Sequence, residues 1–237
     1  MRTFRAVLRK ELSIYFSTPL AYVFLSVVTF LAGLFFYLGL TVSDEASLRI
    51  VIKNTSVVLL FFLPLITMRH FAEEERSGTL ELLMTTPTSL SALILGKWLA
   101  TLVLCSLLCL SCSIFPIILA FYGQPDWGIV FGNTLGLLLC CGAFTAAGTF
   151  ASSLTNEPVA AGLLGVLFLL PFWLIERLVS YLEPGALKNI AEGLAFPNHL
   201  DPFSKGIIDS SAVLWFVLFA VAFLFLTWQS LESRRWR

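Results

Sequence analysis

The sequence has few charged residues for its length. Charged side chains make up 13% of the 237 residues, and 58% of the residues are hydrophobic. Soluble domains have about 25% charged and about 45–50% apolar residues. Together with a mean hydropathy of +0.89, this composition excludes a soluble globular protein and predicts an integral membrane protein. The formal net charge of zero does not set the orientation, because orientation depends on where Lys and Arg are placed.

Motifs typical of phosphate-binding and hydrolytic sites are missing. Gly96-Lys97 resembles the end of a P-loop, but Ser91 stands where that loop needs a glycine. Neither H-E-x-x-H nor G-x-S-x-G occurs. The two histidines, His70 and His199, fall on opposite sides of the predicted membrane, which disfavours a two-histidine metal site. We therefore predict that the chain is not an enzyme and that it binds no cofactor or metal of its own.

Ionisable residues are also missing from the middle of every predicted membrane span. Transporters driven by an ion gradient usually place such residues there, since groups that are costly to bury in a bilayer are kept for function. Coupling to an ion gradient is therefore disfavoured. We expect the energy source to lie on another chain.

Six apolar segments approach or exceed the length of about 20 residues that a helix needs to cross a bilayer. The predicted spans cover residues 20–41, 51–68, 98–122, 127–154, 159–178 and 212–231. The stretch "YGQPDWG" is short and rich in Gly and Pro, so spans three and four are predicted to form a hairpin. We predict an all-α membrane protein with one transmembrane domain over residues 1–237.

Residues 1–17 are predicted to form a basic amphipathic helix that lies on an anionic membrane surface. A charged tail without a defined shape is the alternative. The apolar residues that recur at helical spacing are Phe4, Leu8, Leu12 and Tyr15. The basic residues assigned to the membrane surface are Arg2, Arg5, Arg9 and Lys10.

The distribution of Lys and Arg favours one orientation. With the N-terminus inside, ten of the 15 basic residues fall in inner segments and the other five in outer segments. Such a bias is typical of cytoplasmic segments. We predict a multi-pass protein of the cytoplasmic (inner) membrane with both termini in the cytoplasm.

The cytoplasmic loop 69–91 holds an unusual run of charges, "MRHFAEEERSGTLELLMTTPTS". Residues 71–76 are predicted to continue the second span, Ser77-Gly78 to break that helix, and residues 80–85 to form a short second helix. This helix–break–helix has a shape that a soluble partner can grip. The alternative is a solvated charge run that only obeys topology, but acidic residues contribute little to orientation. Three consecutive glutamates are therefore not explained by topology.

Two further features carry expectations about packing. Gly132 and Gly136 form a G-x-x-x-G pattern on the fourth span, which allows close helix approach within the chain or at a subunit interface. The stretch 176–210 is the long outer connection, with a predicted short helix over 186–194 and a folded-back segment before the sixth span. This stretch could serve as a simple connector, as a lid or as a contact surface for a partner.

Several stretches together resemble the permease subunits of type-2 ABC exporters, with the gliding-motility-associated branch as the closest match. They are "RKELSIYFSTPLAYVFLSVVTFLAGLFF", "ITMRHFAEEERSGTLELLMTTPTS", "LGKWLA" and "FPNHLDPFSKGIIDSSAVLWF". The similarity runs along nearly the whole chain in the same order. Its most specific part is the E-x-x-x-G-T-L-E stretch that ends at Glu81.

The resemblance implies an elbow helix over residues 1–17, six spans, and a coupling helix between spans two and three at about residues 71–85. It also implies two copies of a separate ABC ATPase subunit that carry ATP and Mg, and a second permease chain, identical or different. The coupling residues carried over by position are Phe71, Glu73, Glu74, Glu75, Gly78, Thr79, Leu80 and Glu81.

Function is accordingly predicted as ATP-driven export of an unidentified substrate. The alternative is mechanical transmission of ATPase motion to an extracytoplasmic partner without cargo. An auxiliary membrane or extracytoplasmic protein and membrane lipids are further expected partners, and no nucleic acid is expected.

Overall fold

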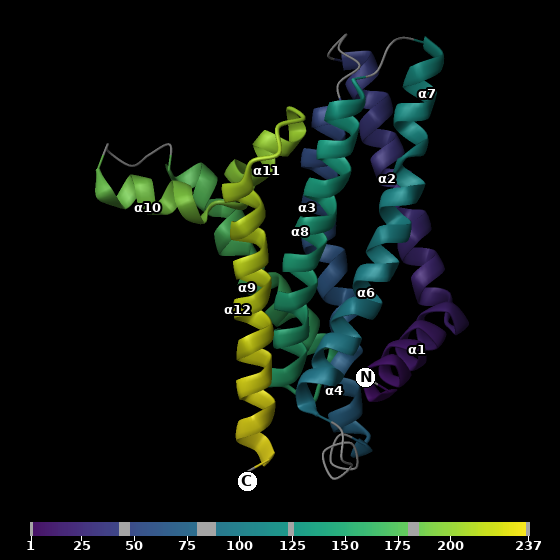
Figure 1. Ribbon diagram of the computed structural model, residues 1–237, viewed down its shortest axis with the longest axis vertical. Coiled ribbons are helices and arrows are strands. Elements are labelled where there is room, and N and C mark those ends of the chain that lie inside the picture. Colours follow the sequence, from purple (N-terminus) through teal and green to yellow (C-terminus); the bar gives the residue numbers. More distant parts are fainter. Residues whose placement is uncertain (1, 43–47, 80–88, 123–125, 180–184, 236–237) are drawn as a thin grey trace.

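The computed structural model describes residues 2–42, 48–79, 89–122, 126–179 and 185–235, and these residues contain helices and no strands (Figure 1). Six of the helical segments are long and apolar enough to cross a membrane, so the predicted all-α fold with six candidate spans is confirmed. The helices are α1 (Arg2–Ser17), α2 (Pro19–Val42), α3 (Leu48–Thr67), α4 (Arg69–Arg76), α6 (Leu90–Cys112), α7 (Ile114–Tyr122), α8 (Trp127–Leu154), α9 (Pro158–Val179), α10 (Ala186–Leu194), α11 (Phe196–Ser204) and α12 (Ser210–Arg235).

The two ends of the bundle differ in what they carry. α1, α4 and both ends of the described chain lie toward one end, and α7, α10 and α11 lie toward the other (Figure 1). An even number of spans brings the two termini to the same end, as observed.

α8 forms the centre of the bundle, where it packs against α3, α6, α9, α11 and α12. Small residues allow these close approaches. A Cβ atom on Gly136 would lie 2.7 Å from Cβ of Phe203, and one on Gly132 would lie 2.9 Å from the carbonyl oxygen of Phe203. The G-x-x-x-G pattern therefore packs against α11 of the same chain.

The third span differs from its predicted form at its start and in its middle, whereas it ends at Tyr122 as predicted. Its helix begins at Leu90 rather than at Trp98, so that Lys97 lies within α6. The helix is also interrupted at Ser113, between α6 and α7. Pro116 explains the interruption, because its ring lacks an N–H and clashes with the carbonyl of Cys112 four residues earlier.

The outer connection contains the predicted helix, α10, with the predicted bounds. α10 lies crosswise to the long helices (Figure 1) and buries none of its residues. α11, in contrast, packs into the end of the bundle. Its Phe196 ring lies 4.9 Å from each of the rings of Phe144, Trp215 and Phe219, measured between centroids.

One ion pair connects α11 to α3, and a second lies at the end of α11 itself. Asp201 accepts a hydrogen bond from Arg49 at 2.5 Å and one from Lys205 at 2.6 Å. Burial raises the pKa of the Asp201 carboxyl, but the bonds from Lys205 and Arg49 outweigh this effect, so the pKa lies below its ordinary value.

We expect this pair to make stability depend on pH. Because folding lowers the pKa, the carboxylate stabilises the fold above its unfolded-state pKa of about 3.9 and loses this contribution as the pH falls through the folded-state value. The side chains are half exposed, so the effect is at most about 1 kcal/mol. Thermal unfolding of the unmodified chain and of Asp201→Asn between pH 3 and 7 measures it: the difference should be largest near pH 7 and shrink toward pH 3. A difference that is constant with pH would contradict the assignment.

Candidate functional site

The end of the second span is extended by α4, as the sequence predicts. A turn at Met68 separates α3 from α4, and α4 ends at Arg76. The predicted break follows: the N–H of Gly78 bonds to the carbonyl of Glu75, three residues back instead of four, and Gly78 adopts a φ of +69°, a conformation that favours glycine. The predicted second helix over 80–85, including Leu80 and Glu81, lies outside the described residues.

A buried cation holds three helices together at this end of the molecule. The ammonium of Lys97 on α6 lies 2.8 Å from a carboxylate oxygen of Glu11 on α1 and 2.9 Å from one of Glu74 on α4. Lys10 reaches the same Glu74 oxygen at 3.3 Å from the solvent side. The Lys97 side chain is only 2% exposed, so it depends on these two carboxylates to replace its hydration.

Beside this ion cluster lies a buried polar network around His70. The Tyr15 hydroxyl and the Thr101 hydroxyl lie 2.8 and 3.0 Å from His70 Nε2, and Thr149 lies 3.1 Å from Nδ1. Thr149 donates its own proton to the carbonyl of Thr145, so we assign the proton of the imidazole to Nδ1, which donates to Thr149. Nε2 is then the acceptor.

Tyr15 is the donor that this assignment requires. Burial raises the pKa of the Tyr15 phenol, so its hydroxyl stays protonated. The network thus connects α1 to α4, α6 and α8 through one neutral imidazole.

Ser152 of α8 fixes the start of α4. Its hydroxyl accepts the backbone N–H groups of Phe71 at 2.9 Å and Ala72 at 3.1 Å, and it donates to the carbonyl of Met68 at 2.9 Å. The first N–H groups of a helix lack partners within the helix. Ser152 supplies partners for two of them from the centre of the bundle.

The structure divides the predicted coupling residues into two groups. Phe71 is fully buried, Glu74 belongs to the ion cluster, and Glu75 forms an ion pair with Arg234 of α12. These three side chains hold α4 to the rest of the chain. The residues that are exposed are Glu73, Gly78 and Thr79.

The predicted surface residues of the N-terminal helix are also placed. Arg5, Arg9 and Lys10 are exposed, while Glu11 and Tyr15 on the opposite side are buried. The amphipathic helix is therefore present, whereas its attachment to a membrane surface stays a prediction. The side chain of Arg2 lies outside the described residues.

A cavity of about 310 Å³ lies between α1 and α4. Its lining includes Tyr15, His70, Glu74 and Lys97. α1 packs closely on α6 and α2, so its connection to α4 runs through side chains that reach across this space. The ion cluster and the hydrogen bond between Tyr15 and His70 therefore link the two helices.

Sequence reasoning missed Lys97, Glu11 and His70 as members of one site. A usable signal was present: Glu11 is the single acidic residue of a basic helix, and Lys97 is a single cation in an apolar stretch. Two lone opposite charges on apolar helix faces suggest that they pair. The local sequence pattern does not, however, predict which helices contact one another.

Comparison with models of known protein families gives a match. A family model described as "ABC-2 family transporter protein" matches residues 40–228. No curated protein matches the chain.

Proposed function

The chain belongs to the ABC-2 family of transporter proteins, and from this premise we propose that it works with a separate ATPase pair to export an unidentified substrate. As a family member it is a membrane-spanning permease subunit of an ABC transporter. We place it, on the stretches quoted above, in the gliding-motility-associated branch, paired with a second permease chain.

The observation that carries the proposal is the ion cluster at the root of α4. Glu73, Arg76, Gly78 and Thr79 form the exposed tip of this element, and we name them the α4 tip. Glu74 and Glu75, on the inner side, join the tip to α1, α6 and α12. A force applied to the tip by a docked ATPase is thereby transmitted to several helices at once.

The proposed mechanism needs no ATP on this chain. ATP-driven closure of the ATPase pair shifts the permease between two states only through contacts that differ between those states. The contacts of α4 are suited to this. Ser152 on α8 hydrogen-bonds to the α4 backbone, and Lys97 on α6 connects Glu74 of α4 to Glu11 of α1. α1, α4 and α6 then move as one lever.

The orientation in the proposal follows from charge. The α4 end carries Lys10, Arg69, Arg76 and Arg234 as well as the basic face of α1. We propose that this end is cytoplasmic, where basic residues are enriched in membrane proteins and where an ATPase has access to ATP.

We expect reversal of exposed charges at the α4 tip to release the ATPase without unfolding the permease. Glu73→Arg combined with Arg76→Glu changes two exposed side chains, so stability should change by no more than about 0.5 kcal/mol. Co-purification of the ATPase from membranes should fall at least several-fold. ATPase bound and active at the unmodified level would refute the docking surface.

The control is Glu192→Arg, a single charge reversal at an exposed position of α10. It should leave ATPase binding unchanged because α10 lies toward the opposite end of the bundle (Figure 1). If no ATPase co-purifies even with the unmodified chain, the proposal of an ATP-driven permease fails as a whole.

A further inference from the structure

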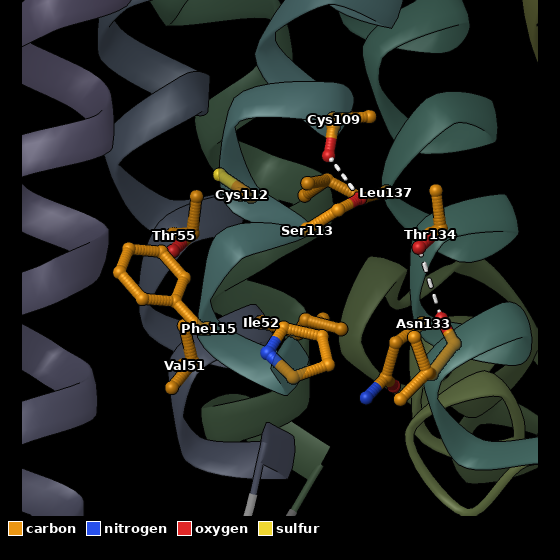
Figure 2. Close-up of a pocket in the computed structure, with 12 residues that line it drawn as sticks. Val51, Ile52, Thr55, Cys109, Cys112, Ser113, Phe115, Asn133, Thr134 and Leu137 are labelled. Atoms are coloured by element: carbon orange, nitrogen blue, oxygen red, sulfur yellow. Dashed lines mark hydrogen bonds between the residues drawn. The ribbon is translucent and has the colours of Figure 1, made fainter. Parts of the chain in front are cut away.

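The end of the bundle opposite α4 contains a pocket between α3, α6, α7 and α8 (Figure 2). It lies where the break between α6 and α7 meets α8, and its volume is about 50 Å³. Most of its wall is apolar, with Ile52, Phe115 and Leu137 among the lining residues. The position is within helices that are long and apolar enough to cross a membrane.

Two polar side chains in this wall are buried without partners. Thr55 is 2% exposed and Asn133 is 4% exposed. Among the described residues, neither the Thr55 hydroxyl nor either polar atom of the Asn133 amide has a hydrogen-bond partner. Both side chains line the pocket.

The other two hydroxyl groups of the wall behave differently. Ser113 donates to the carbonyl of Cys109 at 3.0 Å, and Thr134 donates to the carbonyl of Val130 at 2.9 Å. Their protons are satisfied within their own helices. Thr55 and Asn133 have no such bond, and inside a membrane an unpaired polar group is costly because no bulk water can hydrate it.

We propose that this pocket binds the hydroxyl end of a single-chain apolar molecule, such as a long-chain alcohol or the free hydroxyl of a single-chain lipid. The Asn133 amide offers one acceptor and two donors, so it can both accept from and donate to one hydroxyl. Thr55 supplies a further donor and acceptor. The apolar wall then contacts the first carbons of the chain.

Water alone matches the pocket less well. One water needs about 10–15 Å³ of such space and two to four polar partners, so a pocket of about 50 Å³ has room for several waters but offers partners mainly at Thr55 and Asn133. A molecule with one hydroxyl and an apolar body matches both the polar pair and the wall. This inference does not depend on the proposed coupling to an ATPase.

The test uses the full chain in bilayer discs of dioleoylphosphatidylcholine. The probe is a diazirine-bearing 1-hexadecanol, and the comparison probe is the corresponding diazirine-bearing alkane. We expect the alcohol to label peptides that contain Val51–Thr55 or Val130–Leu137, with competition by 1-hexadecanol and none by hexadecane. Equal labelling by both probes, or none at these peptides, overturns the proposal.

The chain supplies a matched pair of variants, Thr55→Val and Thr134→Val. Both substitutions delete one hydroxyl from the same wall, but the Thr134 hydroxyl already donates its proton to the carbonyl of Val130. Loss of one hydrogen bond should reduce labelling by the alcohol about two- to tenfold in Thr55→Val, and Thr134→Val should label like the unmodified chain. Equal effects of the two substitutions overturn the proposal.

Asn133→Leu provides a second, independent readout. It should abolish the preference for alcohol over alkane and raise the thermal unfolding midpoint measured without probe, because it removes a buried amide that lacks partners. A lowered midpoint together with an unchanged preference for the alcohol would show that the amide serves packing and not this ligand.

Discussion

Replacing Lys97 by methionine should destabilise the protein by about 3–5 kcal/mol, the range found when one partner of a buried ion pair is removed. The methionine side chain is only one heavy atom shorter than that of lysine, so most of the loss comes from charge rather than from volume. The carboxylates of Glu11 and Glu74, which lie 2.8 and 2.9 Å from the Lys97 ammonium, would remain mostly buried without it. Thermal and denaturant unfolding of the purified permease measure the change.

The triple variant Lys97→Met, Glu11→Gln, Glu74→Gln is the control. It removes the buried charges together, so most of the stability should return. It should not restore coupling: ATPase stimulation in the assembled transporter should stay below that of the unmodified protein, because the charged link between α1 and α4 is gone. A Lys97→Met variant that loses less than about 1 kcal/mol would contradict the burial of an essential cation.

Gly148→Ala should cost about 1–3 kcal/mol, the usual result of overfilling a packed interior. A Cβ atom at this position would lie 2.1 Å from Oγ1 of Thr67 and 3.3 Å from Cα of Pro64. The Thr67 hydroxyl is itself held by its bond to the carbonyl of Leu63 at 3.1 Å. The added methyl group would therefore push α8 and α3 apart. This displacement would lie one helical turn before Ser152, whose hydrogen bonds hold the start of α4.

A double variant tests the cause. Thr67→Ala removes the nearest atom, so Gly148→Ala with Thr67→Ala should lose less stability than the sum of the two single changes. Gly39→Ala is the matched control, since no atom lies within 4 Å of its Cβ position, and it should be neutral or stabilise by up to about 1 kcal/mol. Additive losses in the double variant would place the strain elsewhere.

These two predictions concern the same path through the molecule. Gly148 sets the distance between α8 and α3, Ser152 lies one turn further along α8, and Lys97 holds α4 from the other side. We expect Gly148→Ala to weaken ATPase stimulation as well as stability, even though Gly148 is not part of the α4 tip. Unaltered stimulation at a temperature where the variant is folded would argue against a rigid path.

The sequence by itself determined the features that depend on neighbouring residues. Long apolar runs define the six spans, since a bilayer requires helices of that length. The pattern of Phe4, Leu8 and Tyr15 defines α1, and Ser77-Gly78 defines the end of α4 because glycine permits the positive φ found there. The break at Ser113 also has a local cause, Pro116. The continuous apolar run around Pro116 predicts a single span and gives no sign of the break.

Tertiary structure decided which charges are internal. Glu73, Glu74 and Glu75 are consecutive, and successive residues of a helix point in directions about 100° apart. Only the arrival of Lys97 and Arg234 from other helices decides that Glu74 and Glu75 face inward while Glu73 faces outward.

The same applies to Lys97, which the predicted spans leave in an inner segment, just before the third span. Glu11, 86 residues away in the chain, and Glu74, 23 residues away, remove the cost of burying its charge. A local pattern carries no information on such distant partners. The carboxylates that compensate the buried charge of Lys97 reach it only when α1, α4 and α6 pack together, and this packing forms the site.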